Sequence, residues 1–223
     1  TLAPMFPHLV WASLDGFGPL GPQKDDPGFD IVAFFAGTGL MIDYCEADTA
    51  PMNPAIAFGD FTTGGTLAGG IAAALFQREK TGKGEKVMIS LMGQSLYNQA
   101  NTIMTANMGI DPYPKSRKRP SSPLINSFRC KDGEWVMVSM LDYNRYYPAV
   151  CDMIGRPDMK DDSRFNDILA GKANSAALTE ILDAWFAQHD YAEVDHLLQQ
   201  ADIAHNRIKH LTDMPDDPQA KAN

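Results

Sequence analysis

One aspartate stands at the start of a long helical segment, where a carboxylate has two different uses. Asp60 precedes a run of small and apolar residues in AFGDFTTGGTLAGGIAAALFQREKTGKGEKV, residues 57–87. As an N-cap, it would accept a backbone N–H from the first turn of a helix that begins near Phe61. As a nucleophile, it would be kept ionised by the same N–H groups and the helix dipole. Those donors would also stabilise an oxyanion during attack on a carbonyl. The local sequence leaves both interpretations open.

Glycines shape the same segment. Gly65, Gly69 and Ala73 recur every four residues, so one face of the helix is nearly bare. An interior glycine costs about 0.5–1 kcal/mol relative to alanine, so we expect close approach at this face. A neighbouring helix or backbone is the favoured interpretation, and a bulky ligand is the alternative. Gly59 is expected to give a ligand similar access to Asp60.

Other chemical motifs are weak. GFGPLG, residues 16–21, matches GxGxxG, but Pro19 and Pro22 interrupt the helix that a dinucleotide site requires, so we interpret it as a turn. Neither the three cysteines nor the five histidines have a familiar metal-ligand spacing. We therefore expect no metal site.

Composition excludes two classes of partner. The chain has 223 residues and a net charge of -9, which disfavours nucleic acid as a partner. The longest apolar run, residues 31–42, is shorter than the roughly 20 residues of a membrane span. Three scattered cysteines do not form a disulfide framework, and they fit a reducing cytoplasm.

Hydrophobic patterns predict an α/β arrangement in the first half. Strands are expected over residues 8–14 and 86–91, and helices over 29–42, 61–80 and 94–108. TGKG, residues 81–84, supplies a glycine for a left-handed helix C-cap. Alternating strands and helices indicate a parallel sheet.

The second half has a different pattern. Residues 109–123 are rich in proline and basic side chains and are expected to be a linker. Residues 125–130 and 134–140 flank a tight turn at Asp132-Gly133, which predicts a hairpin. Helices are expected over 144–154, 176–189 and 191–200. These elements indicate a smaller α+β domain.

The motif PxxxFGDFTTGxxxxGGIAAALFQREKTGKGEKVMISL resembles the class III CoA-transferase family, which includes formyl-CoA transferase, carnitine CoA-transferase and α-methylacyl-CoA racemase. LVWASLDGFGPLGPQKDDPGFDIV and SPLINSFRCKDGEWVMVSM are similar to other family segments, as are GRPDMKDDSRF and IAHNRIKHLTDMPDDPQ. The resemblance extends through essentially the whole chain.

The resemblance implies a Rossmann-like large domain with a smaller α+β domain, in an interlocked homodimer. On this basis the chain is expected to be an internal fragment of a longer protein. We assign residues 1–108 to part of the CoA-binding large domain and 109–123 to the linker. Residues 124–205 are assigned to the small domain, and 206–223 to a segment that returns toward the large domain.

The resemblance also implies an acyl-CoA:carboxylate CoA-transferase with Asp60 as the nucleophile. Asp60 would form an aspartyl anhydride and then an aspartyl-CoA thioester. The substrates would be an acyl-CoA and a carboxylic acid acceptor, with coenzyme A as substrate and no tightly bound cofactor. Pro27, Gly28, Phe29 and Asp30 are assigned to the CoA site by the same resemblance.

Two alternatives to this assignment remain. The family's racemases use a histidine at the position that Phe29 occupies here. Phenylalanine carries no titratable proton, so racemisation is disfavoured. A CoA-binding or dimerisation module without chemistry, with Asp60 as a cap, is the third hypothesis. Phe29 is also interpretable as a core aromatic, and Asp30 as the N-cap of its own helix.

Substrate size gives one further expectation. No counterpart of the glycine-rich loop of formyl-CoA transferase occurs between Gly109 and Phe128, which disfavours oxalate and formate. Phe58, Phe61 and Met52 suggest a larger aryl or branched-chain acid, or they belong to the core. Lys24 and a linker cluster of four basic residues are interpreted as candidate CoA-phosphate contacts. For the cluster, a solvated linker is the favoured interpretation; its members are Lys115, Arg117, Lys118 and Arg119.

Overall fold

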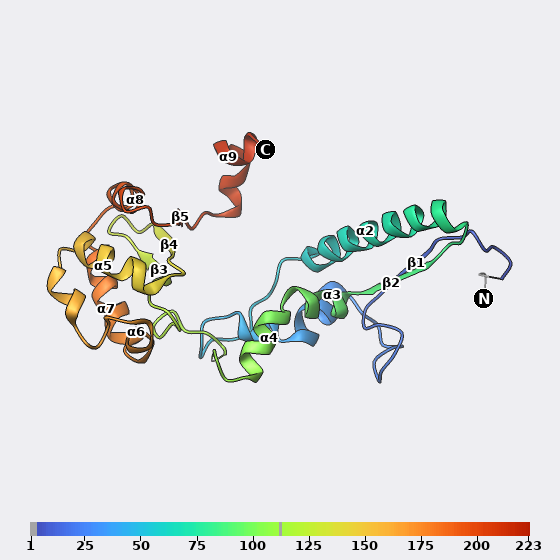
Figure 1. The fold of residues 1–223 in the computed structure, drawn as a ribbon, viewed down its shortest axis with the longest axis horizontal. Helices are drawn as coiled ribbons and strands as arrows, with labels where there is room; N and C mark the ends of the chain where they lie inside the picture. Colours follow the sequence, from blue (N-terminus) through green and yellow to red (C-terminus); the bar gives the residue numbers. More distant parts are fainter. Residues whose placement is uncertain (1–3, 112) are drawn as a thin grey trace. The chain divides into compact units, whose positions relative to one another are not determined.

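The computed structural model describes residues 4–111 and 113–223. Residues 1–3, at the start of the predicted large-domain part, and Pro112 of the predicted linker lie outside the described residues. The chain divides into two compact units, Thr1–Lys115 and Ser116–Asn223. Both units combine helices and strands, which confirms the α/β class in its broad form (Figure 1). The predicted domain limits stay a prediction.

The first unit is built on a parallel strand pair. β1 (Trp11–Asp15) pairs with β2 (Lys86–Ser90), and the long helix α2 (Phe58–Thr81) lies between them in the chain. The pairing is parallel, which confirms the prediction. Parallel neighbours need a long connection of this kind. The C-cap residue of α2 is Gly82, which has a φ of 70° and donates its N–H to Arg78 O at 2.8 Å. The predicted left-handed C-cap is therefore present.

The single helix predicted over residues 29–42 is wrong. A short π-helix, η1 (Asp30–Phe35), is followed by a 3₁₀ turn, η2 (Ala36–Thr38), and by α1 (Leu40–Asp43). The helical conformation is interrupted at Gly39, whose φ of 86° is left-handed and suits a residue without Cβ. Ala33, Phe34 and Phe35 of η1 form the buried core of this unit together with Leu91.

The helix predicted over residues 94–108 is also divided. α3 (Leu91–Asn98) starts earlier than predicted, because Ser90 Oγ accepts the N–H of Gly93 at 3.0 Å and caps the helix. α4 (Ala100–Asn107) follows after Gln99. The buried Gln99 side chain donates to Thr38 O and Ser95 Oγ, both at 3.1 Å. The interruption therefore lies where a side chain bonds to η2.

The second unit contains a three-stranded sheet. β3 (Ile125–Arg129) and β4 (Trp135–Ser139) form the predicted hairpin, which turns through Gly133 with a φ of 91°. β5 (His205–Arg207) pairs antiparallel with β4 and gives the order β3-β4-β5. This strand was not predicted, and it extends past the predicted small-domain limit at residue 205.

Helices cover the hydrophobic core of the second unit. α5 (Tyr143–Met153), α7 (Ser175–Phe186) and α8 (Tyr191–Gln200) confirm the three predicted helices. The rings of Phe128 and Phe186 stack with centroids 4.4 Å apart. Four shorter elements complete the chain: η3 (Pro157–Asp161), α6 (Ile168–Ala173), η4 (Leu211–Asp216) and α9 (Pro218–Lys221).

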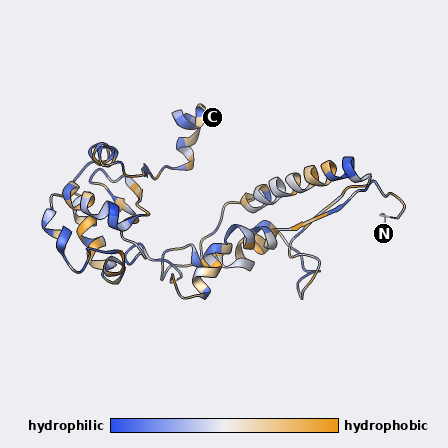
Figure 2. Cartoon of the chain, viewed as in Figure 1, coloured by the Kyte–Doolittle hydropathy of each residue, from blue (hydrophilic) through white to orange (hydrophobic). Residues whose placement is uncertain are grey.

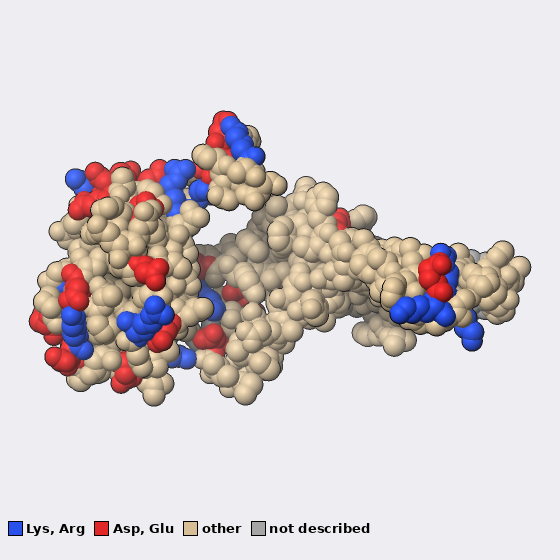
Figure 3. All heavy atoms as spheres, turned by 45° about the horizontal axis from the view of Figure 1, so that its top comes forward, with Lys and Arg blue, Asp and Glu red and all other residues tan. Residues whose placement is uncertain are grey.

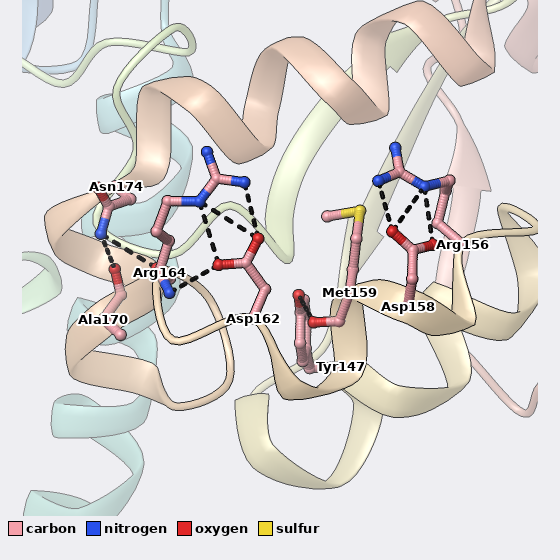
Figure 4. A network of polar contacts seen from close by, with 8 residues as sticks. All are labelled: Tyr147, Arg156, Asp158, Met159, Asp162, Arg164, Ala170 and Asn174. Carbon is pink, nitrogen blue, oxygen red and sulfur yellow. Dashed lines mark hydrogen bonds and ion pairs between the residues drawn. The ribbon is translucent and has the colours of Figure 1, made fainter.

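Polar contacts fix the connection between α5 and α7 (Figure 4). Tyr147 donates its hydroxyl to Met159 O at 2.8 Å, and Asn174 donates its side-chain amide to Arg164 O at 3.1 Å. Hydrogen bonds from Arg164 lower the pKa of Asp162 to about 2. This network ties the connection to the helices on either side of it, so we assign it a structural role.

Arg117 is part of the second unit. Its guanidinium donates to both carboxylate oxygens of Asp183, at 2.9 and 2.8 Å, and to Ser127 O at 3.0 Å. A bidentate pair of this kind fixes geometry as well as charge. The interpretation of the basic cluster as solvated linker is therefore wrong for Arg117, which joins its segment to α7 and β3.

Residues 4–111 and 113–223 contain neither a membrane-spanning helix nor a cluster of metal ligands. In that part of the chain, no helix is both long and apolar enough to cross a bilayer. The same residues contain no group of three or more His, Cys, Asp or Glu side chains with metal-binding geometry.

Candidate active site

The helix that carries Asp60 begins earlier than predicted. α2 starts at Phe58, and its N-cap residue, Ala57, makes no side-chain capping bond. Asp60 is therefore the third residue of the helix, and its interpretation as the N-cap is wrong. Ala57 has a φ of 67°, in the left-handed region that disfavours residues with a Cβ. Strained backbone residues of this kind cluster at functional sites, and Ala57 lies three residues before Asp60.

The Asp60 carboxylate is unpaired in the described part of the chain. The residue is exposed, and its side chain makes no hydrogen bond or ion pair with the residues that the structure describes. It is the single Asp, Glu, Lys or Arg between Asp48 and Arg78. Figure 2 shows that α2 becomes strongly hydrophilic at its C-terminal end, and Figure 3 shows charged side chains near that end of the helix. The nucleophile candidate is thus an isolated charge on an apolar helix.

Gly59 allows η1 to pack against the first turn of α2. A Cβ at this position would collide with Asp30 Oδ1 and with the ring of Phe34. The space beside Gly59 is therefore filled by η1, and the expected access of a ligand past Gly59 is wrong. The hydroxyls of Thr62 and Thr63 donate to Gly59 O at 2.9 and 2.7 Å, which reinforces the same turn.

Asp30 is buried at this junction. The residue is 5% exposed, and neither carboxylate oxygen makes a hydrogen bond in the described structure. Burial raises the pKa of Asp30, and the negative charge of Asp60 raises it further, while the N–H groups of Gly59, Ala57 and Asp60 act in the opposite direction. Phe29, not Asp30, is the N-cap residue of η1, and no side chain caps that helix. The N-cap interpretation of Asp30 is therefore wrong.

The other three residues assigned to the CoA site lie in the loop before η1. A Cβ on Gly28 would lie 2.6 Å from Gly16 Cα, so both glycines serve a close backbone contact. Phe29 is 75% exposed, which rules out the core-aromatic interpretation in this chain, and Pro27 is also exposed. Lys24, in the same loop, pairs with Asp25 at 3.7 Å on the surface. The assignment of a CoA site here stays a prediction.

The bare face of α2 is open in the described structure. A Cβ on Gly65 or Gly69 would meet no atom within 4 Å, whereas one on Gly70 would lie 2.7 Å from Val87 Cγ1. Phe58 and Phe61 are 58% and 81% exposed. The close packing expected at Gly65 and Gly69 is therefore not made by the described residues.

Comparison with known proteins identifies the family. The model of "CoA-transferase family III" matches residues 1–223. The chain belongs to this family. It is 37% identical to (R)-2-hydroxy-4-methylpentanoate CoA-transferase of Clostridioides difficile, over 98% of this chain and 54% of that protein. It is 35% identical to cinnamoyl-CoA:phenyllactate CoA-transferase of Clostridium sporogenes, over 100% of this chain and 55% of that protein.

Solved structures agree with this family III assignment. A hypothetical protein from Mycobacterium tuberculosis matches with a TM-score of 0.82 and 27% identity, over 100% of this chain and 59% of that one. A CAIB/BAIF family protein from Brucella suis matches with a TM-score of 0.77 and 26% identity, over 99% of this chain and 58% of that one. The chain thus spans a little more than half the length of the relatives that it matches.

Proposed function

We propose that the full-length protein is an acyl-CoA:carboxylate CoA-transferase whose nucleophile is Asp60. The main support is the position of Asp60, which is an exposed, uncapped and unpaired carboxylate in the first turn of α2. Membership of CoA-transferase family III supports the reaction class. A carboxylate that is free of hydrogen bonds in the resting protein is available to attack a thioester.

The proposed reaction passes through two kinds of covalent intermediate. An Asp60 oxygen attacks the thioester carbonyl of acyl-CoA, the C–S bond breaks, and a mixed anhydride and CoA thiolate form. The thiolate attacks the Asp60 carbonyl of the anhydride, which releases the first carboxylate and leaves an aspartyl-CoA thioester. The acceptor carboxylate then attacks this thioester and displaces the thiolate. The thiolate attacks the new acyl carbonyl and restores the Asp60 carboxylate. No net proton or electron is required.

Coenzyme A enters this proposal as a substrate. We place it along residues 27–30, where the exposed Phe29 ring offers an apolar surface. No tightly bound cofactor or metal takes part in the steps above.

We further propose that the first unit is part of a Rossmann-like domain and that the protein acts as a cytoplasmic homodimer. The thiols Cys45, Cys130 and Cys151, which are free among the described residues, fit a reducing compartment.

For the acceptor, we propose a branched or aryl 2-hydroxy acid. The two relatives described above are named for 2-hydroxy-4-methylpentanoate and phenyllactate. Phe58 and Phe61 lie near Asp60 in the sequence and are exposed, so their rings are available to an apolar substrate side chain. A racemase is disfavoured because Phe29 cannot exchange a proton at an α-carbon.

An isotope experiment tests the reaction class. The full-length protein is mixed with unlabelled acyl-CoA and ¹³C-labelled 2-hydroxy-4-methylpentanoate, phenyllactate, glutarate or oxalate in deuterated water. We expect label in the CoA thioester for the first two acids, slower transfer to the others, and no deuterium at the α-carbon. Deuterium at the α-carbon without transfer would instead favour the racemase. If the protein binds CoA but gives neither transfer nor deuterium, a non-catalytic module would be favoured.

A further inference from the structure

Asp30 combines burial with a lack of hydrogen-bond partners. Among the described residues, only its two carboxylate oxygens and Thr179 Oγ1 are buried side-chain polar atoms without a hydrogen bond. A carboxylate in this state costs free energy unless it is paired or protonated. Asp30 therefore lowers the stability of the fold at neutral pH, and a role in packing does not explain a charged side chain at this position.

The Asp30 carboxylate faces the N-terminus of α2. Its Oδ1 occupies the space that a Cβ on Gly59 would need, beside the buried ring of Phe34. The N–H groups of Ala57, Gly59 and Asp60 favour its ionised form. α2 is 24 residues long, so its first turn presents unpaired N–H groups and the positive end of the helix dipole. An anion at this place occupies the site that a capping carboxylate would otherwise take.

Asp60 lies in the same turn but does not take that site. It is exposed and unpaired with respect to the described residues, so two carboxylates share one helix N-terminus and only the buried one faces the backbone donors. If the Asp60 carboxylate took that site, hydrogen bonds from several N–H groups would stabilise its anion and weaken it as a nucleophile.

We propose that Asp30 is a positioning residue whose buried carboxylate occupies the anion site at the N-terminus of α2, sets the conformation of the first turn, and leaves the Asp60 carboxylate outside that site and free for attack. This inference rests on the proposed function, because it assigns Asp30 a task only if Asp60 is the nucleophile. Asp30 thus has a role within the proposed CoA segment 27–30 that needs no contact of its side chain with CoA, since this side chain is enclosed by η1 and α2.

Replacement of Asp30 in the full-length protein tests the proposal. Asp30→Asn keeps the shape and removes the charge, while Asp26→Asn is a matched control at an exposed residue whose carboxylate makes no hydrogen bond or ion pair with the described residues. We expect kcat for CoA transfer to fall about 10- to 100-fold in Asp30→Asn, because the nucleophile is displaced from its reactive position. KM for acyl-CoA should change less than threefold, because the substrate still binds in the same place. The control should keep the parent kcat.

A stability measurement separates positioning from a purely structural role. Burial raises the pKa of Asp30 above its ordinary value of 3.8. Protonation of Asp30 therefore contributes stability to the folded state. This contribution is fully present below the unfolded-state pKa and is lost as pH rises through the folded-state pKa. Around Asp30, α2 contributes the charge of Asp60, and η2 and α3 contain no Asp, Glu, Lys, Arg or His. Asp30→Asn should therefore unfold at a higher temperature than the parent at pH 7, and this difference should disappear near pH 4 (about the unperturbed pKa of Asp).

Several outcomes would overturn the proposal. A folded Asp30→Asn variant with the parent kcat would remove the positioning role, and a raised KM with unchanged kcat would indicate direct contact with CoA. If Asp30→Asn fails to fold, Asp30→Ala is measured in its place. Loss of folding in both variants would mean that Asp30 is structural. Failure of the proposed function is seen separately, as absence of transfer by the parent protein, and it would overturn both statements.

Discussion

Asp60→Asn in the full-length protein is expected to lower turnover by roughly 10⁴-fold or more, as removal of a covalent nucleophile does in other enzymes. Asparagine has almost the same shape as aspartate, but its amide is a far weaker nucleophile toward a thioester. The exposed Asp60 side chain makes no hydrogen bond or ion pair with the described residues that the change would remove. The assay is CoA transfer under saturating substrates, with KM determined separately.

The stability of the same variant is expected to change by less than about 1 kcal/mol. The negative charge of Asp60 interacts favourably with the N-terminus of α2, which is worth about 0.3–1 kcal/mol, but it also repels Asp30. These two effects oppose each other. Thermal unfolding of Asp60→Asn and of the control Asp26→Asn measures the difference. An Asp60→Asn variant that folds and keeps normal turnover would contradict the assignment of the nucleophile.

Gly59→Ala is expected to affect both stability and activity. The new Cβ would collide with Asp30 Oδ1 and the ring of Phe34, which is 1% exposed and has little room to move. Overpacking of this kind costs about 1–3 kcal/mol, more than the 0.5–1 kcal/mol that alanine gains over glycine in a helix. The first turn of α2 must shift, so turnover should fall with stability. Denaturant unfolding and the transfer assay measure the two effects.

Gly64→Ala is the matched control for this prediction. It lies in the same helix, and a Cβ there would meet no described atom within 4 Å. It should therefore be neutral or stabilising in the chain described here. Equal loss of stability in both variants would instead indicate that another segment or subunit covers this side of α2. An unchanged Gly59→Ala protein would contradict the close packing between η1 and α2.

Local signals predicted several elements correctly. Gly82 is the C-cap of α2, and Asp132-Gly133 lies in the turn between β3 and β4. Both could be predicted locally, because glycine adopts a left-handed backbone conformation without steric cost. The limits of α8 agree with the apolar spacing of residues 191–200. The segment that resembles the family predicts Asp60 as the nucleophile. The structure adds that Asp60 is the third residue of α2 and so is not its N-cap.

Other features depend on distant contacts and could not be predicted in the same way. β5 has three residues and exists because it pairs with β4, about 70 residues earlier. Gln99 interrupts a helical pattern where it bonds to Thr38, and η1 is a π-helix that ends before Gly39. The burial of Asp30 against Gly59 had no local signal, since an aspartate at a helix start usually caps that helix.

Direct chemical trapping tests the central claim. The full-length protein is incubated with an acyl-CoA of a branched or aryl 2-hydroxy acid, treated with hydroxylamine, and digested for mass spectrometry of the peptide that contains Asp60. We predict a hydroxamate on Asp60 that depends on acyl-CoA and is absent from Asp60→Asn. An unmodified Asp60 peptide in protein that is transferring CoA would contradict the account, because transfer would then proceed without the aspartyl intermediates.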